Sequence, residues 1–138
     1  MVEPPNQEDL AGPEPLSLDG WEVVKNFLGK TQADARRMFE TGRGFSTEDF
    51  MWMAPEGLRY YLGPALEYLR AEESKNDWFC HGLLCSLSCQ VKWGLPSDLL
   101  PQIQEIAEYA DTHRAKYDIE DSDILFKEYI EDIRKGSR

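Results

Sequence analysis

The segment from residue 77 to residue 93 constrains the fold more than any other part of the chain, because it is the most apolar. On a helix, with about 100° between successive side chains, its first apolar stripe consists of Phe79, Cys80, Leu83, Leu84, Leu87 and Val91. A second stripe consists of Trp78, Cys85, Cys89 and Trp93. A helix with apolar residues on nearly all sides is usually buried. We therefore expect this segment to be the central helix of the protein.

The other apolar residues also recur at helical spacing, and the alternation typical of strands is absent from the sequence. Val, Ile and Thr, which favour strands, together number 14 residues. The sequence thus predicts an all-α fold, a single-domain irregular bundle of about six helices. The last helix is expected to bury one stripe, made of Leu125, Phe126, Tyr129, Ile130 and Ile133.

Capping residues and helix breakers predict the helix boundaries. Thr31 and Asp34 resemble a capping box in front of a helix over about 32–41. Pro55 suits the first turn of a further helix, which the Gly63-Pro64 pair is expected to break or kink. A second helix would then continue to about residue 73.

Two serines are the expected N-terminal caps of the later helices. Ser97 precedes the helix that follows the central segment, and Ser122 precedes the last helix. Between these two helices, residues 118–123 are expected to form an acidic loop, because four of the six side chains are carboxylates.

The N-terminal segment differs from the rest in composition. Four of the eight prolines fall within the first 15 residues, and no basic residue precedes Lys25. Since proline lacks a backbone donor and restricts its neighbour, a long helix or central strand is excluded there. We predict a flexible, Pro-rich acidic arm over residues 1–16 and a helical domain over residues 17–138.

The net charge limits the classes of partner. The chain has 26 acidic and 15 basic side chains, which gives a net charge of −11. This balance disfavours a nucleic-acid binder, which needs clustered Lys and Arg, and disfavours docking on anionic membranes. A basic protein is the partner that fits, because complementary charge speeds association.

Location is predicted from what the sequence lacks. There is no run of 18 apolar residues, and Met1-Val2-Glu3 lacks the basic start of a secretory signal. Three cysteines are an odd number, which is more typical of reduced thiols than of a disulfide framework. We expect a cytoplasmic protein.

The cysteines and histidines are weak candidates for a metal site or a nucleophile. On one helix, Cys80 lies about 140° from Cys85 and about 180° from Cys89, so the three thiols do not converge on one ion. His81 points about 100° away from Cys80, and His113 lies far along the chain. We expect buried thiols and no metal.

Two further motifs are also too incomplete to indicate a cofactor. The acidic run at 118–123 lacks the central Gly of an EF-hand loop, so a solvated loop leading into a helix cap is expected. Gly42-Arg43-Gly44 is too short to cradle a polyphosphate, and no GKS or GKT follows it. No cofactor is expected.

The most distinctive stretch is Ala54-Pro55-Glu56-Gly57-Leu58-Arg59-Tyr60-Tyr61-Leu62-Gly63-Pro64-Ala65. It resembles the hallmark of a family of small acidic bacterial proteins that carry a PEGxRYYLPA-type segment. The match covers Phe50 to Leu69, and this sequence differs by placing Gly63 before the proline. The resemblance implies a small helical cytosolic protein of bacterial type and implies no particular reaction.

Arg59 and Tyr60 within this stretch have two interpretations. Both residue types are enriched at binding hot spots, which makes them a candidate recognition pair. Alternatively, Tyr61 packs inward, Tyr60 meets a neighbouring helix, and Arg59 pairs with Glu56 or another acid. Both interpretations stay open at this point.

Three functions remain, and a non-enzymatic one is favoured. The first is an immunity-like or regulatory module that binds a basic protein through an acidic face, made of Glu120, Asp121, Asp123, Glu128, Glu131 and Asp132. The second is a small-molecule or peptide-binding module with an aromatic pocket, lined by Trp52, Tyr60, Tyr68, Trp78 and Trp93. The third is an enzyme that uses a cysteine or carboxylates.

Overall fold

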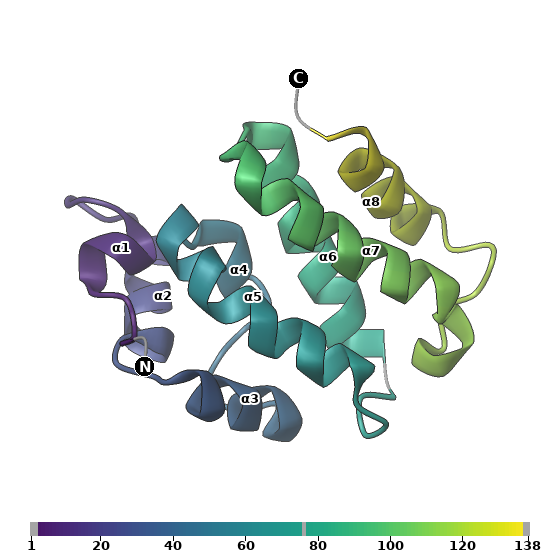
Figure 1. The fold of residues 1–138 in the computed structure, drawn as a ribbon, viewed down its shortest axis with the longest axis horizontal. Helices are drawn as coiled ribbons and strands as arrows, with labels where there is room; N and C mark the ends of the chain where they lie inside the picture. The colour runs from purple at the N-terminus through teal and green to yellow at the C-terminus, as the bar shows by residue number, and fades with distance from the viewer. Residues whose placement is uncertain (1–2, 76, 137–138) are drawn as a thin grey trace.

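The computed structural model describes residues 3–75 and 77–136. In these residues it contains eight α-helices, two short 3₁₀ helices and no strand, which confirms the all-α irregular bundle (Figure 1). The α-helices are α1 (Gln7–Ala11), α2 (Leu18–Phe27), α3 (Gln32–Thr41), α4 (Asp49–Trp52), α5 (Pro55–Arg70), α6 (Asp77–Trp93), α7 (Leu100–Thr112) and α8 (Ile124–Lys135). The 3₁₀ helices are η1 (Ser97–Leu99) and η2 (Arg114–Tyr117).

The helix α6 lies between the two halves of the molecule, as the sequence predicts. It contacts α4 on one side and α7 and α8 on the other (Figure 1). Its direction is parallel to α8, because His81 near its start pairs with Asp123 and Lys92 near its end pairs with Asp132. The first apolar stripe of α6 is buried along its whole length, from Phe79 to Val91.

The second apolar stripe of α6 differs from the expectation of burial on all sides. The indoles of Trp78 and Trp93 are exposed, while Cys85 and Cys89 are half-buried against α8. Trp93 contacts Trp52 with ring centroids 5.3 Å apart. The helix is therefore covered on most of its surface, and its two ends leave tryptophans at the solvent boundary.

A cluster of phenylalanines joins α2, α3, α4 and α6 in the core. The rings of Phe27 and Phe50 lie 6.0 Å apart, and Phe39 and Phe79 lie 5.0 Å apart. Phe45 packs on Phe39 at 5.2 Å. Because aromatic pairs in tilted or edge contacts stabilise beyond their buried area, this cluster fixes how the N-terminal helices meet α6.

A row of small and polar residues on α6 contacts the segment from Thr47 to Met53 and holds it in place. Gly82, Ser86 and Gln90 recur at intervals of four, so they share one face of the helix. Ser86 Oγ donates to the Thr47 carbonyl at 2.8 Å. Gln90 Nε2 donates to the carbonyls of residues 50, 51 and 53. Carbonyl groups at the end of the short α4 are thus hydrogen-bonded by one side chain.

The N-terminal arm differs from its expected flexible form. Residues 7–11 form α1, in which Asn6 caps the helix and Leu10 is fully buried. The Ala54 N–H donates to the Leu10 carbonyl at 2.8 Å, and α1 contacts both α2 and α5. Gly57 leaves room for this contact, because a Cβ there would lie 3.0 Å from the Leu10 carbonyl oxygen. The burial of Leu10 and this backbone hydrogen bond anchor the segment.

The helix α5 continues through Gly63-Pro64 as one helix, where two helices were expected. Proline has no N–H for the carbonyl of residue 60, which loses its helical partner. Gln32 Nε2 from α3 donates to that Tyr60 carbonyl at 2.7 Å. The hydrogen bond lost inside α5 is therefore replaced from the neighbouring helix, which explains why the helix continues.

Two expected helix caps are also wrong, whereas one is confirmed. Thr31 and Asp34 form the predicted capping box at the start of α3. At α8 the cap is Asp123, which accepts from the Phe126 N–H at 2.9 Å, so Ser122 is not the cap. Ser97 instead starts η1, without a side-chain cap.

We expect Gln32→Ala to destabilise the protein by about 1–2 kcal/mol, because it leaves the Tyr60 carbonyl without its donor. Urea unfolding of wild type and variant measures this change. In a Pro64→Ala background, position 64 regains its N–H, so Gln32→Ala should cost distinctly less. An equal cost in both backgrounds would show that Gln32 acts through some other contact.

We also expect opposite effects from two Gly→Ala substitutions within helices. A Cβ at Gly82 would lie 2.2 Å from Thr47 Oγ1, so Gly82→Ala should destabilise by about 1–3 kcal/mol. Apart from its two chain neighbours and the backbone of α5, a Cβ at Gly63 would meet no atom within 4 Å, so Gly63→Ala should stabilise by about 0.5–1 kcal/mol. Thermal melts of both variants measure the contrast, and destabilisation by Gly63→Ala would contradict it.

Candidate functional site

The structure does not bring the predicted site residues together. Arg59 and Tyr60 lie on α5, beside α1 and α3, whereas residues 118–123 lie in the loop that leads into α8. In Figure 1 these regions are on different sides of the molecule. They must therefore be considered as two separate surfaces.

Arg59 is held by two carboxylates of the chain itself. Its guanidinium donates to both oxygens of Asp98, at 3.0 and 2.9 Å, and also to Glu56. The hydrogen bonds from Arg59 lower the pKa of Asp98 below its ordinary value. This geometry joins the start of α5 to η1, and it matches the structural interpretation of Arg59.

Tyr60 is nearly buried and forms one wall of a surface cleft. Its ring makes an edge contact with Tyr61 at 4.8 Å. The cleft has a volume of about 460 Å³ and is lined by Glu3, Pro4, Pro5, Asn6, Asp9, Gln32, Glu56, Arg59 and Tyr60. Segment 3–9 thus shapes a cleft on α5 that has more carboxylates than bases.

Contacts with other residues of the same chain hold the acidic loop in place. Asp123 caps α8 and its Oδ2 lies 3.4 Å from His81 Nε2 of α6. Asp121 lies 3.9 Å from Arg114, and its side chain is fully exposed. Ser122 Oγ lies 3.5 Å from Glu120, and Ile119, which precedes Glu120, is buried. Asp123 is therefore a structural residue, whereas Glu120 and Asp121 face the solvent.

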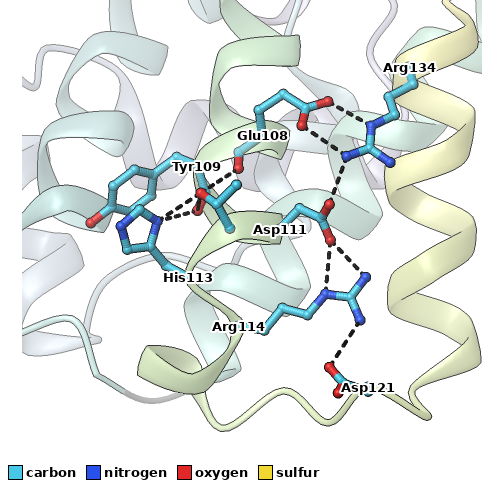
Figure 2. Close-up of polar contacts among 8 residues, drawn as sticks. Glu108, Tyr109, Asp111, His113, Arg114, Asp121 and Arg134 are labelled. Atoms are coloured by element: carbon cyan, nitrogen blue, oxygen red, sulfur yellow. Dashed lines mark hydrogen bonds and ion pairs between the residues drawn. The ribbon is translucent and has the colours of Figure 1, made fainter.

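A network of ion pairs ties this loop and α8 to α7 (Figure 2). Arg134 donates to both oxygens of Glu108, at 2.6 and 2.9 Å, and to Asp111 at 2.7 Å. Arg114 pairs with the other oxygen of Asp111 at 2.7 Å. The arginine of α8 and the arginine of η2 thus share one carboxylate of α7.

The same network sets the pKa of its carboxyl groups. Burial by itself would raise the pKa of Asp111, but hydrogen bonds from Arg114 and Arg134 outweigh it and lower the pKa. The hydrogen bond from Arg134 lowers the pKa of Glu108 as well. Both carboxyl groups are therefore charged in the folded protein at neutral pH.

The outer face of α8 carries the feature that sequence reasoning missed. Ile124 and Leu125 are 70% and 55% exposed, although Leu125 was expected to point inward. Phe126, Ile130 and Ile133 supply the buried stripe without it. Glu128 and Glu131 are exposed on the same side as Ile124, and within residues 3–75 and 77–136 neither has an ion-pair partner.

We call this surface the α8 face and define it by Glu120, Asp121, Ile124, Leu125, Glu128 and Glu131. It combines two exposed apolar side chains with four carboxylates, and the exposed Lys127 lies on the same side of α8, beside Glu131. Asp132, which was predicted to belong to the acidic surface, is instead paired with Lys92 at 3.5 Å. In the sequence, the only sign of this surface is that two adjacent apolar residues, Ile124 and Leu125, stand at the start of the last helix. Helical periodicity nevertheless assigned Leu125 to the core.

The thiols and imidazoles differ in their burial and in their contacts. Cys80 is buried, and burial raises the pKa of the half-buried Cys89 thiol. His113 stacks on Tyr109 at 4.0 Å, far along the chain from the cysteines. Among the residues described, no group of three His, Cys, Asp or Glu is placed to hold a metal ion.

The five aromatic residues proposed for a ligand pocket lie in three places. Trp52 contacts Trp93, Tyr68 and Trp78 border a second shallow hollow, and Tyr60 lines the cleft on α5. A single aromatic pocket built from all five is therefore wrong. Their sequence positions, which fall on the three helices α4, α5 and α6, gave no indication of this separation.

None of the helices in the described residues has the length and apolar character that crossing a bilayer requires. No family model, curated protein or solved structure matches the chain. What the protein does must therefore be inferred from its own residues.

We expect Arg134→Met to destabilise the protein by up to about 1 kcal/mol at about pH 7, because these ion pairs are half exposed and screened by water. The pKa values of Glu108 and Asp111 are lowered below their ordinary 4.5 and 3.8, so the stabilisation is present above those values. It is lost as the pH falls through the lowered pKa values of the folded state. Unfolding free energies of wild type and variant should therefore converge on acidification, and a difference independent of pH would contradict the assignment.

Proposed function

We propose that the protein is a non-enzymatic, protein-binding module of the immunity-like or regulatory kind, which holds a basic protein partner on the α8 face. The observation that carries the proposal is the exposed Ile124–Leu125 pair, bordered by carboxylates of which Glu128 and Glu131 form no ion pair among the described residues. Apolar anchors inside a charged border are typical of protein interfaces, where the apolar centre supplies affinity and the charges supply rate and specificity.

The distribution of ion pairs supports an acidic binding surface. In the described residues, arginines are largely occupied by carboxylates of the same chain, namely Arg36, Arg37, Arg59, Arg70, Arg114 and Arg134. The surplus of carboxylates therefore stays at the surface. On the α8 face, Glu128 and Glu131 are part of this surplus.

The support of the α8 face by rigid elements also favours a binding role. Arg134 and Arg114 fix α8 and the acidic loop to α7 (Figure 2). The His81–Asp123 contact fixes the start of α8 to α6. A surface whose backbone is held in place before binding loses less conformational freedom in the complex. These contacts thus make the α8 face a better candidate binding surface than a flexible acidic tail would be.

The test uses the immobilised full chain to capture partners at low salt from a lysate of the organism that encodes it. We expect a basic protein to be captured. Calorimetry with this purified partner should then show that it binds the chain directly. The double variant Glu128→Gln/Glu131→Gln and the double variant Ile124→Ser/Leu125→Ser should each raise Kd by roughly tenfold or more.

The matched control is Glu67→Gln/Glu72→Gln, which removes two exposed carboxylates away from the α8 face. Its Kd should equal that of the wild type. The proposal fails if no basic protein is captured, or if this control weakens binding as much as the α8 variants. Raised salt should slow association of the wild type more than that of Glu128→Gln/Glu131→Gln.

A further inference from the structure

The cleft on α5 takes its walls from three parts of the chain. Segment 3–9 forms one wall, the first two turns of α5 form a second, and Gln32 of α3 adds a third. In Figure 1, α1 lies beside the first turns of α5, with which it is in contact. The cleft volume of about 460 Å³ lies within the usual range for small-molecule sites.

Hydrogen bonds within the chain hold these walls together. The Ala54 N–H, just before α5, donates to the Leu10 carbonyl of α1 at 2.8 Å. From α3, Gln32 Nε2 donates to the Tyr60 carbonyl at 2.7 Å. The cleft is therefore formed before any ligand enters, so binding requires little ordering of the chain.

The one basic side chain of the cleft is already occupied. Arg59 donates to both oxygens of Asp98 and also to Glu56. An anionic ligand would therefore have to compete with two carboxylates of the chain for this guanidinium.

Two carboxylates of the cleft, in contrast, have no partner among the described residues. Glu3 and Asp9 form neither a hydrogen bond through their carboxylates nor an ion pair within residues 3–75 and 77–136. Glu56 adds a third negative charge to the lining. The cleft thus offers free acceptors and negative charge, which suit a ligand that donates hydrogen bonds and is positively charged.

Tyr60 supplies an independent observation that points to a ligand. Its side chain borders the cleft, and the residue is only 8% exposed. The hydroxyl of the neighbouring Tyr61 donates to the Phe27 carbonyl at 2.9 Å, whereas the Tyr60 hydroxyl has no hydrogen-bond partner in the described part of the chain. Because polar groups with so little exposure are nearly always hydrogen-bonded, a ligand in the cleft is the natural partner of this hydroxyl.

We propose that the cleft on α5 binds an aliphatic polyamine. Its ammonium groups pair with the carboxylates of Glu3 and Asp9 and donate to the Tyr60 hydroxyl. The half-buried Pro4 and Pro5 lie in the same lining and offer apolar surface to the methylene groups between the charges. This proposal goes beyond the proposed function, because it uses no residue of the α8 face.

A metal ion fits the cleft less well than an organic cation. Hard divalent cations take six or more oxygen ligands, and among the described residues no three His, Cys, Asp or Glu are placed to hold a metal ion. The prolines and the tyrosine ring of the lining also give a metal ion nothing to bind, whereas they can cover an alkyl chain.

The test is an NMR titration of the ¹⁵N-labelled full chain with spermidine, a linear triamine. We expect saturable binding, with the largest amide shifts at residues 6–9 and 56–60. Glu3→Gln/Asp9→Asn should raise Kd at least about tenfold, because it removes the two free carboxylates. Tyr60→Phe keeps the ring and removes only the hydroxyl, so it should raise Kd about two- to tenfold.

The matched control is Glu67→Gln/Glu72→Gln, which removes two exposed carboxylates outside the cleft and should leave Kd unchanged. Butylamine, with a single ammonium group, should bind at least about tenfold more weakly than spermidine.

Three results would overturn the proposal. The first is an equal affinity for Mg²⁺ with shifts at the same amides, which would indicate charge attraction alone. The second is an equal affinity for butylamine, which would exclude a ligand that needs several ammonium groups. The third is a spermidine Kd that neither Glu3→Gln/Asp9→Asn nor Tyr60→Phe changes. The capture experiment on the α8 face uses other residues, so either proposal can fail without the other.

Discussion

The arrangement of the N-terminal helices depends on the contact between segment 47–53 and α6. Gly82 lets the backbone near Thr47 approach, and Ser86 and Gln90 donate to its carbonyls. Once α4 is fixed there, Phe50 enters the aromatic cluster and Asp49 accepts from Asn26 of α2 at 2.8 Å. Desolvation raises the pKa of Asp49, so its hydrogen bonds are needed to keep the carboxylate in place. The helix α6 is central because of its apolar stripe and also because of its row of Gly82, Ser86 and Gln90, which holds segment 47–53.

Local signals in the sequence predicted what local chemistry controls. The helical class, the buried stripe of α6 and the Thr31–Asp34 capping box depend on neighbours within a few residues, and all are found in the structure. The continuation of α5 through Pro64 depends on Gln32, which lies 28 residues before the carbonyl that it binds. No local pattern indicates such a donor. The anchoring of α1 by Leu10 is likewise a tertiary effect on a Pro-rich segment.

The same distinction between local signals and tertiary contacts applies to the candidate surfaces. Composition indicated that carboxylates exceed bases, but it did not indicate which carboxylates are consumed by ion pairs. The pairing of Asp98 with Arg59, of Asp111 with Arg114 and Arg134, and of Asp132 with Lys92 is visible only in three dimensions. Periodicity assigned Leu125 to the core because its spacing places it in one stripe with Tyr129 and Ile133. The exposed position of Leu125 and of Ile124 is what turns an acidic helix into a surface with apolar anchors.

Hydrogen exchange of the full chain, with and without the captured basic protein, tests most directly whether the α8 face is where that partner binds. Binding there excludes water from the acidic loop and the first turns of α8, so exchange of amides at residues 118–131 should slow. Exchange in α3, on the other side of α5, should not change. Slowed exchange confined to α3 and the cleft at Tyr60, with residues 118–131 unaffected, would contradict this assignment.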